Sequence, residues 1–137
     1  MSPLVMPTET SPRPRRSAPW FNLALTNLPL PGLVSIFHRI SGILLFFGLV
    51  ILLFLFDRSL ASPEGYAQAG AIVGHWFAKL VMLGLLWSFA HHFCAGIRYL
   101  FLDIHKGIDL PTARATSRAV FAVSLALTAI LGWALLW

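Results

Sequence analysis

A serine, a histidine and an arginine lie together in the segment SIFHRISG, residues 35–42, at the start of a long apolar run. Ser35 and Arg39 are four residues apart, so in a helix they share a face, with His38 beside them. Arginine pairs with carboxylates such as haem propionates, and serine and arginine together can hydrogen-bond a quinone carbonyl and stabilise charge on it. The simpler interpretation is an interfacial anchor in which Arg39 reaches lipid phosphate.

His92 lies within a second apolar segment, LGLLWSFAHHFCAGIRYLFLD, residues 83–103. An ionisable group inside a membrane span is a functional candidate. Helical spacing places mostly small residues on its face: Gly84, Ser88, Ala95, Gly96, Tyr99 and Asp103. They leave a shallow groove in which a flat group could lie with the imidazole at its centre, as a b-type haem requires. Close helix packing through glycine and serine explains the same pattern, so both interpretations stay open at this point.

Only one histidine of this segment faces the groove. His91 is rotated by about 100° from His92 and shares a face with Trp87 and Arg98, so both histidines cannot bind one iron. His91 is therefore expected to pack or to form a hydrogen bond. A second axial ligand would come from another chain. His92 lies about 16 Å of helix before Asp103, which places it near the middle of a membrane.

The composition is that of a membrane protein. Of the 137 residues, 58% are hydrophobic and 11% are charged, and the mean hydropathy is +0.78; a soluble domain of this length needs more charge to cover its surface. The net charge of +5 does not indicate a nucleic-acid partner, because the basic residues flank apolar runs and form no basic face with interleaved aromatics. The single cysteine, Cys94, excludes an internal disulfide framework.

Three uncharged runs are long enough to cross a bilayer core of ~30 Å: residues 40–56, 80–97 and 119–137. The fold class is therefore predicted to be an all-α membrane protein with three transmembrane helices. Turn and cap residues extend these runs, so the helices are expected at roughly 31–57, 66–104 and 112–137. The first run is too far from the start of the chain to be a cleavable signal.

Residues 1–19 are rich in Pro, Ser, Thr and Arg and predict a flexible basic tail, followed by one anchor domain over residues 20–137. Positive charges gather in this tail and in the second loop, which contains Lys106, Arg114 and Arg118. The positive-inside rule therefore predicts a cytoplasmic N-terminus and second loop, with the C-terminus outside. In that orientation the SIFHRISG segment and Arg98 both lie at the cytoplasmic side.

The two polar segments together resemble a known family. SIFHRISG, followed on the second helix by HHFCAGIRYLFLD, is similar to the cytochrome b556 subunits of succinate dehydrogenase. The family pattern is Ser-x-x-His-Arg-x-Ser/Thr-Gly, then His-x-x-x-Gly-x-Arg-His with an aspartate four residues later. The resemblance covers residues 22–137, and the two motifs are specific when they occur together.

The resemblance implies roles for individual residues. His92 matches the axial ligand of a haem b, the histidine four residues before the motif glycine, Gly96. Ser35 and Arg39 match residues that line a ubiquinone site, and His38 with Arg39 matches the region near the haem propionates.

The end of the second motif is matched less closely. Arg98 and Asp103 match the family positions, and the resemblance implies a structural or propionate-facing role for them. Tyr99 stands where the family usually has a second histidine. A tyrosine can donate a hydrogen bond to a propionate or to water, but it cannot carry positive charge.

The resemblance also implies partners. A second membrane anchor subunit would supply the other haem ligand, and an iron–sulfur subunit and a flavoprotein subunit would dock on the cytoplasmic side and oxidise succinate. This chain has no dinucleotide motif and no cysteine cluster, so it binds neither FAD nor an iron–sulfur cluster itself. The expected location is the bacterial inner membrane, or the mitochondrial inner membrane with the matrix in place of the cytoplasm.

Other functions fit parts of the pattern. A fumarate reductase anchor would use the same geometry in reverse with menaquinol. A small non-redox membrane protein would use its histidines only for packing. A proton or metal carrier would use His91 and His92.

Overall fold

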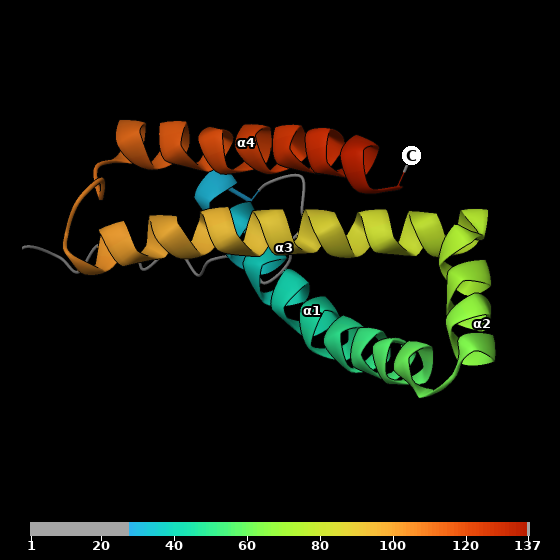
Figure 1. Cartoon of the computed structure of the whole chain (residues 1–137). Coiled ribbons are helices and arrows are strands. Elements are labelled where there is room, and N and C mark those ends of the chain that lie inside the picture. Colours follow the sequence, from blue (N-terminus) through green and yellow to red (C-terminus); the bar gives the residue numbers. More distant parts are fainter. Residues whose placement is uncertain (1–27, 137) are drawn as a thin grey trace, which may run out of the picture.

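The computed structural model describes residues 28–136, which form four helices and no strand (Figure 1). Their bounds are α1 Leu30–Ala61, α2 Pro63–Gly74, α3 Trp76–Asp103 and α4 Leu110–Leu136. The tail expected over residues 1–19 lies outside the described residues. Three of the helices, α1, α3 and α4, are long and apolar enough to cross a membrane, which confirms the predicted all-α fold with three candidate spans. The ends of the helices extend past the expected membrane core, because 27 to 32 residues of helix measure about 40–48 Å.

The single helix expected over residues 66–104 is two helices. α2 begins with the Ser62 hydroxyl accepting a hydrogen bond from the Gly65 backbone, with Pro63 in the first turn. At His75 the backbone is extended, and the imidazole accepts a hydrogen bond from the Phe77 amide at 3.3 Å. His75 therefore ends α2 and caps α3, so that α2 runs across the end of the bundle and links α1 to α3 (Figure 1).

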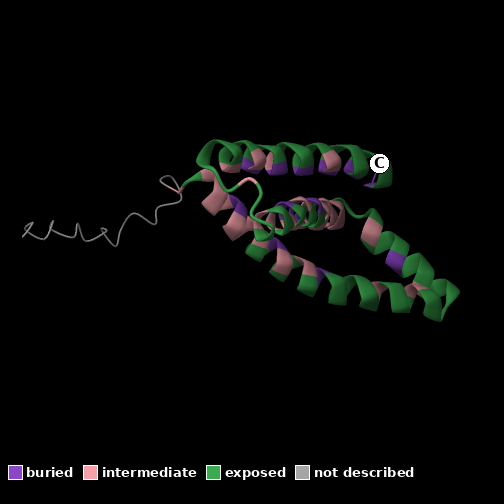
Figure 2. Ribbon diagram, turned by 90° about the vertical axis from the view of Figure 1, so that its left-hand side faces the viewer, coloured by how far each residue is buried: buried purple, intermediate pink, exposed green. Residues whose placement is uncertain are grey.

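α3 is the central helix and packs against α4 on one side and α1 on the other (Figure 1). The buried side of α4 carries residues at helical spacing, most of them small: Ser117, Val120, Ser124, Thr128, Gly132 and Leu136. Figure 2 shows these buried positions as a strip on the side of α4 that faces α3. Small residues allow the close helix approach that is typical of membrane bundles, and the serine and threonine hydroxyls are satisfied by carbonyls within α4.

α1 contacts α3 mainly through its first half and then diverges from it (Figure 1). Its second half presents large apolar side chains to the outside, among them Phe46, Phe47 and Phe54, each more than 60% exposed. Side chains of this kind suit contact with lipid or with another transmembrane helix rather than with water.

The turn between α3 and α4 is short and well defined. His105 and Gly107 have positive φ values of 57° and 76°, which reverse the chain after α3. Asp109 then caps α4, because its carboxylate accepts a hydrogen bond from the Thr112 amide at 3.0 Å. Hydrogen bonds from the Thr112 hydroxyl and amide lower the pKa of Asp109. α4 thus begins at Leu110, two residues before the expected start.

Candidate functional site

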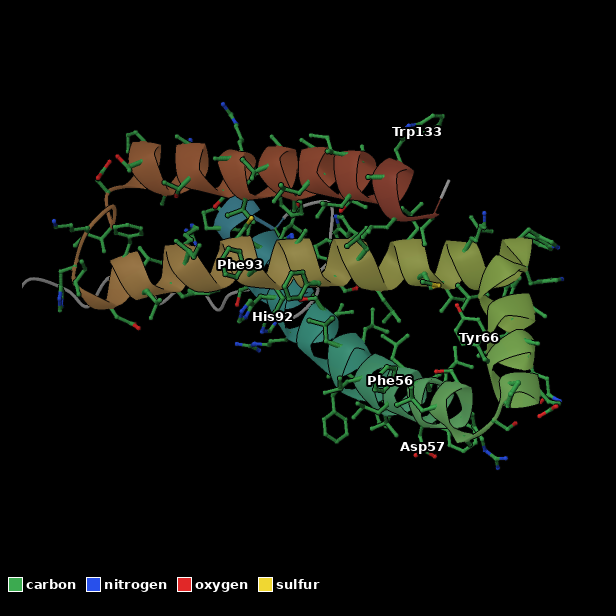
Figure 3. The ribbon with its side chains drawn as sticks, viewed as in Figure 1. Phe56, Asp57, Tyr66, His92, Phe93 and Trp133 are labelled. Carbon is green, nitrogen blue, oxygen red and sulfur yellow. The ribbon has the colours of Figure 1, made fainter. Side chains whose placement is uncertain are left out.

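α1 and α3 bring two histidines together where the helices cross; Figure 3 shows His92 on α3 at this crossing. The rings of His38 and His92 are stacked, with centroids 4.0 Å apart and an interplanar angle of 10°. A Cβ atom at Gly42 would lie only 3.1 Å from His92 Cε1, and one at Gly96 would lie 3.9 Å from His38 Nε2. Each histidine therefore packs against a glycine of the opposite helix, and Gly42 is needed for the close approach.

The backbone carbonyl of His38 determines which ring nitrogen of neutral His92 carries the proton. Nδ1 of His92 lies 3.0 Å from this carbonyl oxygen and 3.2 Å from the Ser41 hydroxyl, which itself donates to the same carbonyl at 2.9 Å. A carbonyl oxygen can only accept, so Nδ1 carries the proton and the lone pair of the neutral ring is on Nε2. Nε2 makes no hydrogen bond with another residue in the range 28–136.

This arrangement fits a histidine that binds a metal. Metal-binding histidines typically donate their other ring N–H to a carbonyl or carboxylate, as His92 does. The His38 ring covers one face of the His92 ring, whereas the lone pair of Nε2 lies in the plane of its ring. Within the described chain, no three His, Cys, Asp or Glu side chains gather into a metal site made by protein alone. The single available nitrogen of His92 suits a haem b, whose porphyrin already supplies four nitrogens to the iron.

Tyr99 lies next to the histidine pair. Its ring meets the His38 ring edge-on, with centroids 5.1 Å apart. The hydroxyl is buried and has no hydrogen-bond partner among residues 28–136. An unpaired buried hydroxyl costs roughly 1–3 kcal/mol, so a partner from outside the described residues is expected. A haem propionate or a bound water has the required acceptor.

Ser35 and Arg39 lie on successive turns of α1, on either side of His38 along the chain. Ser35 is half-buried and Arg39 is exposed. Neither side chain makes a hydrogen bond or an ion pair with another described residue. The structure thus places the two predicted quinone-binding residues beside His38, with their polar groups available to a ligand.

Arg98 lies on a different side of α3 from His92. Its guanidinium Nε donates to the Thr116 hydroxyl of α4 at 3.1 Å, and its Cζ lies 5.6 Å from the centre of the Tyr99 ring. Arg98 is 8% exposed. The structure therefore brings Arg98 together with α4 and not with Arg39 or with the His38–His92 stack.

His91 belongs to the helix packing, as its rotation from His92 predicts. It is fully buried, and its ring lies 5.2 Å from Trp87, 5.1 Å from Phe121 and 6.0 Å from Phe37 between ring centroids. Neither ring nitrogen makes a hydrogen bond of ordinary geometry with a described residue. His91 is thus the centre of an aromatic cluster formed by all three long helices.

Sequence reasoning did not assign a role to Ser41, although its hydroxyl contacts both His92 and the His38 carbonyl. The sequence does contain an indication. Ser41 stands three residues after His38 and directly before Gly42, so it lies one turn along the same face of α1 as the histidine.

The sequence matches the family model described as succinate dehydrogenase/fumarate reductase transmembrane subunit over residues 13–131. It is 31% identical over 109 residues to a succinate dehydrogenase cytochrome b556 subunit of Paracoccus denitrificans, covering 80% of this chain and 84% of the relative. The protein of the same name from Coxiella burnetii is 35% identical over 107 residues, covering 75% and 85%. That of Rickettsia felis is 28% identical over 110 residues, covering 80% and 86%.

Proposed function

Since this chain belongs to the succinate dehydrogenase/fumarate reductase transmembrane subunit family, we propose that it is the haem b-binding anchor of a succinate dehydrogenase and helps to form its ubiquinone-reduction site. The observation that carries the proposal is the state of His92. Its Nδ1 is held by the His38 carbonyl, and its Nε2 is left without a partner in the described chain.

His92 would bind the haem iron through Nε2, and His38, Arg39 and Tyr99 would lie near the propionates. When bound, the haem supplies a one-electron redox centre beside the quinone site. His38 is not the second axial ligand in this proposal, because two rings stacked face to face at 4.0 Å cannot bind opposite sides of one iron. The second ligand would come from a second membrane anchor subunit. The resemblance implied either a structural or a propionate-facing role for Arg98. The structural role is better supported, because Arg98 donates a hydrogen bond to Thr116 on α4.

Ser35 and Arg39 would bind ubiquinone at the first turns of α1. The Ser35 hydroxyl would donate a hydrogen bond to one quinone carbonyl. The Arg39 guanidinium would stabilise the negative charge that develops on the quinone oxygen as it accepts electrons. Water at this end of the chain would deliver the protons that complete the reduction.

An iron–sulfur subunit and a flavoprotein subunit would bind at the same end of the chain and deliver electrons from succinate. This proposal places the N-terminus and the α3–α4 turn in the cytoplasm of a bacterium and the C-terminus outside its inner membrane. The basic residues Lys106, Arg114 and Arg118 near that turn support this orientation.

A reduced-minus-oxidised absorption spectrum of the purified chain, with whatever subunits copurify, tests the proposal. A b-type band together with bound flavin is the expected result. A colourless chain that copurifies with no flavoprotein would contradict the proposal and favour a non-redox membrane protein. Activity with succinate and ubiquinone, compared with activity with fumarate and menaquinol, then separates a succinate dehydrogenase from a fumarate reductase.

A further inference from the structure

A buried arginine lies beside an open pocket at the end of α3 that leads into the α3–α4 turn. Arg98 is 8% exposed and donates from Nε to the Thr116 hydroxyl. The pocket has a volume of about 320 Å³. Its polar lining includes Arg98, Lys106 and Thr116, and its apolar lining includes Cys94, Ile97 and Phe101. It lies away from the His38–His92 stack, between α3 and α4.

The charge of Arg98 is not neutralised within the described chain. A guanidinium carries five N–H donors. Among the described residues 28–136, Arg98 forms a side-chain hydrogen bond only through Nε, to Thr116. Two acidic residues belong to the same end of the molecule. Asp109 accepts from Thr112 as the cap of α4, and Asp103 is exposed and forms no ion pair with a described residue. A cation that is nine-tenths buried without an anion is strongly disfavoured, so an anion from outside the described residues is expected.

The depth of the pocket suits the headgroup layer of a membrane. α3 contains 28 residues, or about 42 Å of helix, whereas the apolar core is ~30 Å thick. Shared between its two ends, the excess of about 12 Å carries about four residues of each end into the headgroups. Arg98, five residues before the end of α3, therefore lies at the boundary between the apolar core and the headgroups. Basic pockets between transmembrane helices on the cytoplasmic side are typical binding sites for anionic phospholipids.

We propose that this pocket binds one anionic phospholipid. The planar fork of Arg98 matches the geometry of a phosphate, and Lys106 at the rim adds a second positive charge. The apolar wall formed by Cys94, Ile97 and Phe101 takes the beginning of an acyl chain. The proposal rests on the cytoplasmic orientation of the α3–α4 turn and requires neither haem nor quinone.

A haem propionate has a similar anionic chemistry, but the geometry favours the lipid. Arg98 follows His92 by six residues, so the two side chains leave α3 about 120° apart. His92 contacts α1, whereas Arg98 contacts α4. An anion bound by the pocket at Arg98 would therefore lie toward α4, whereas the side chain of His92 lies toward α1.

The test is native mass spectrometry of the intact complex in nanodiscs that contain equal amounts of phosphatidylcholine and phosphatidylglycerol. The wild type should retain one phosphatidylglycerol per copy of this chain after release into the gas phase. Arg98→Gln should lower that occupancy by at least about fivefold, the effect of one basic residue at a membrane surface. Thr116→Val, which removes the hydroxyl that holds Nε, should lower it by a smaller factor.

Arg118→Gln is the matched control, because it removes the same charge from an exposed position of α4 outside the pocket, and it should retain the lipid. Wild-type occupancy in Arg98→Gln, or an equal loss in Arg118→Gln, would overturn the proposal. A shifted haem band in Arg98→Gln with unchanged lipid would also overturn it and assign Arg98 to a propionate. If Arg98→Gln does not assemble, Lys106→Gln at the exposed rim takes its place, with about a fivefold loss expected and no loss contradicting the site. The lipid count is independent of the haem spectrum, so failure here leaves the proposed redox function standing.

Discussion

The imidazole rings of His38 and His92 lie parallel and 4.0 Å apart, although 54 residues separate them in the sequence. The same residue, His38, also provides the carbonyl that accepts the hydrogen bond from His92 Nδ1. One turn of α1 thus determines both the orientation of the His92 ring and the nitrogen that remains available. Substitutions around this pair distinguish a haem site from ordinary helix packing.

His92→Leu removes the only nitrogen proposed to bind iron from this chain. The b-type band of the purified complex should disappear or shift, because the iron keeps at most the axial histidine of the other anchor. His91→Phe is the matched control. His91 sits in an aromatic cluster without hydrogen bonds of ordinary geometry, so a ring of similar size should keep the haem and change stability by less than about 1.5 kcal/mol. An unchanged spectrum in His92→Leu would reject it as a ligand.

Gly42→Val tests the close approach of α1 to the His92 ring. A Cβ atom added at Gly42 would lie 3.1 Å from His92 Cε1, so the larger valine side chain must displace the ring, at a cost of about 1–3 kcal/mol. The haem-to-flavin ratio and the Tm of the complex should both fall. Gly32→Ala is the control, because its added Cβ would make ordinary contacts of 3.7 Å and longer. If the two variants had the same haem-to-flavin ratio and the same Tm, the position of the His92 ring would not depend on Gly42.

Arg39→Leu should lower ubiquinone reduction by about a hundredfold or more, the typical effect of removing one donor to a developing negative charge. Succinate oxidation with an artificial acceptor should remain, since it needs only the soluble subunits. Ser35→Ala removes one neutral hydrogen bond and should cost about fivefold. Arg58→Leu, in the last turn of α1, should leave both rates unchanged. Normal ubiquinone reduction in Arg39→Leu would remove it from the proposed site.

Lowering the pH should loosen the first turn of α4. The pKa of Asp109 is lower in the folded chain than in the unfolded chain, because Thr112 hydrogen-bonds the ionised carboxylate. Its stabilising contribution is therefore complete above the unfolded pKa and is lost as the pH falls through the folded pKa. The amides of Leu110 and of residues 112–114 should be less protected from hydrogen exchange in acid than at neutral pH, after correction for intrinsic exchange. In Asp109→Asn the asparagine side chain can still cap α4, but it has no carboxyl group to titrate. The pH dependence of protection should then vanish; if it persists, another group is responsible.

The sequence predicted the number of candidate spans, because hydropathy and helix length are properties of each segment by itself. It did not predict the break between α2 and α3. Both sides of the break have helix-forming composition, and the interruption depends on the extended backbone of a single residue, His75. Gly74 and His75 together are a possible stop signal, but glycine also occurs inside the helices of this chain, at Gly42 and Gly96.

For the candidate site, the sequence alone determined the residue types, their order and their angle around each helix axis. It thereby singled out His92 and separated it from His91. The tertiary structure decided which residues of other helices contact these side chains. His38 and Ser41 contact His92, and Thr116 contacts Arg98. Helical periodicity fixes the direction of a side chain relative to its own axis. The helix that occupies that direction is set by the packing of glycines against large side chains far away in the sequence, such as Gly42 against His92 and Gly132 against Leu83.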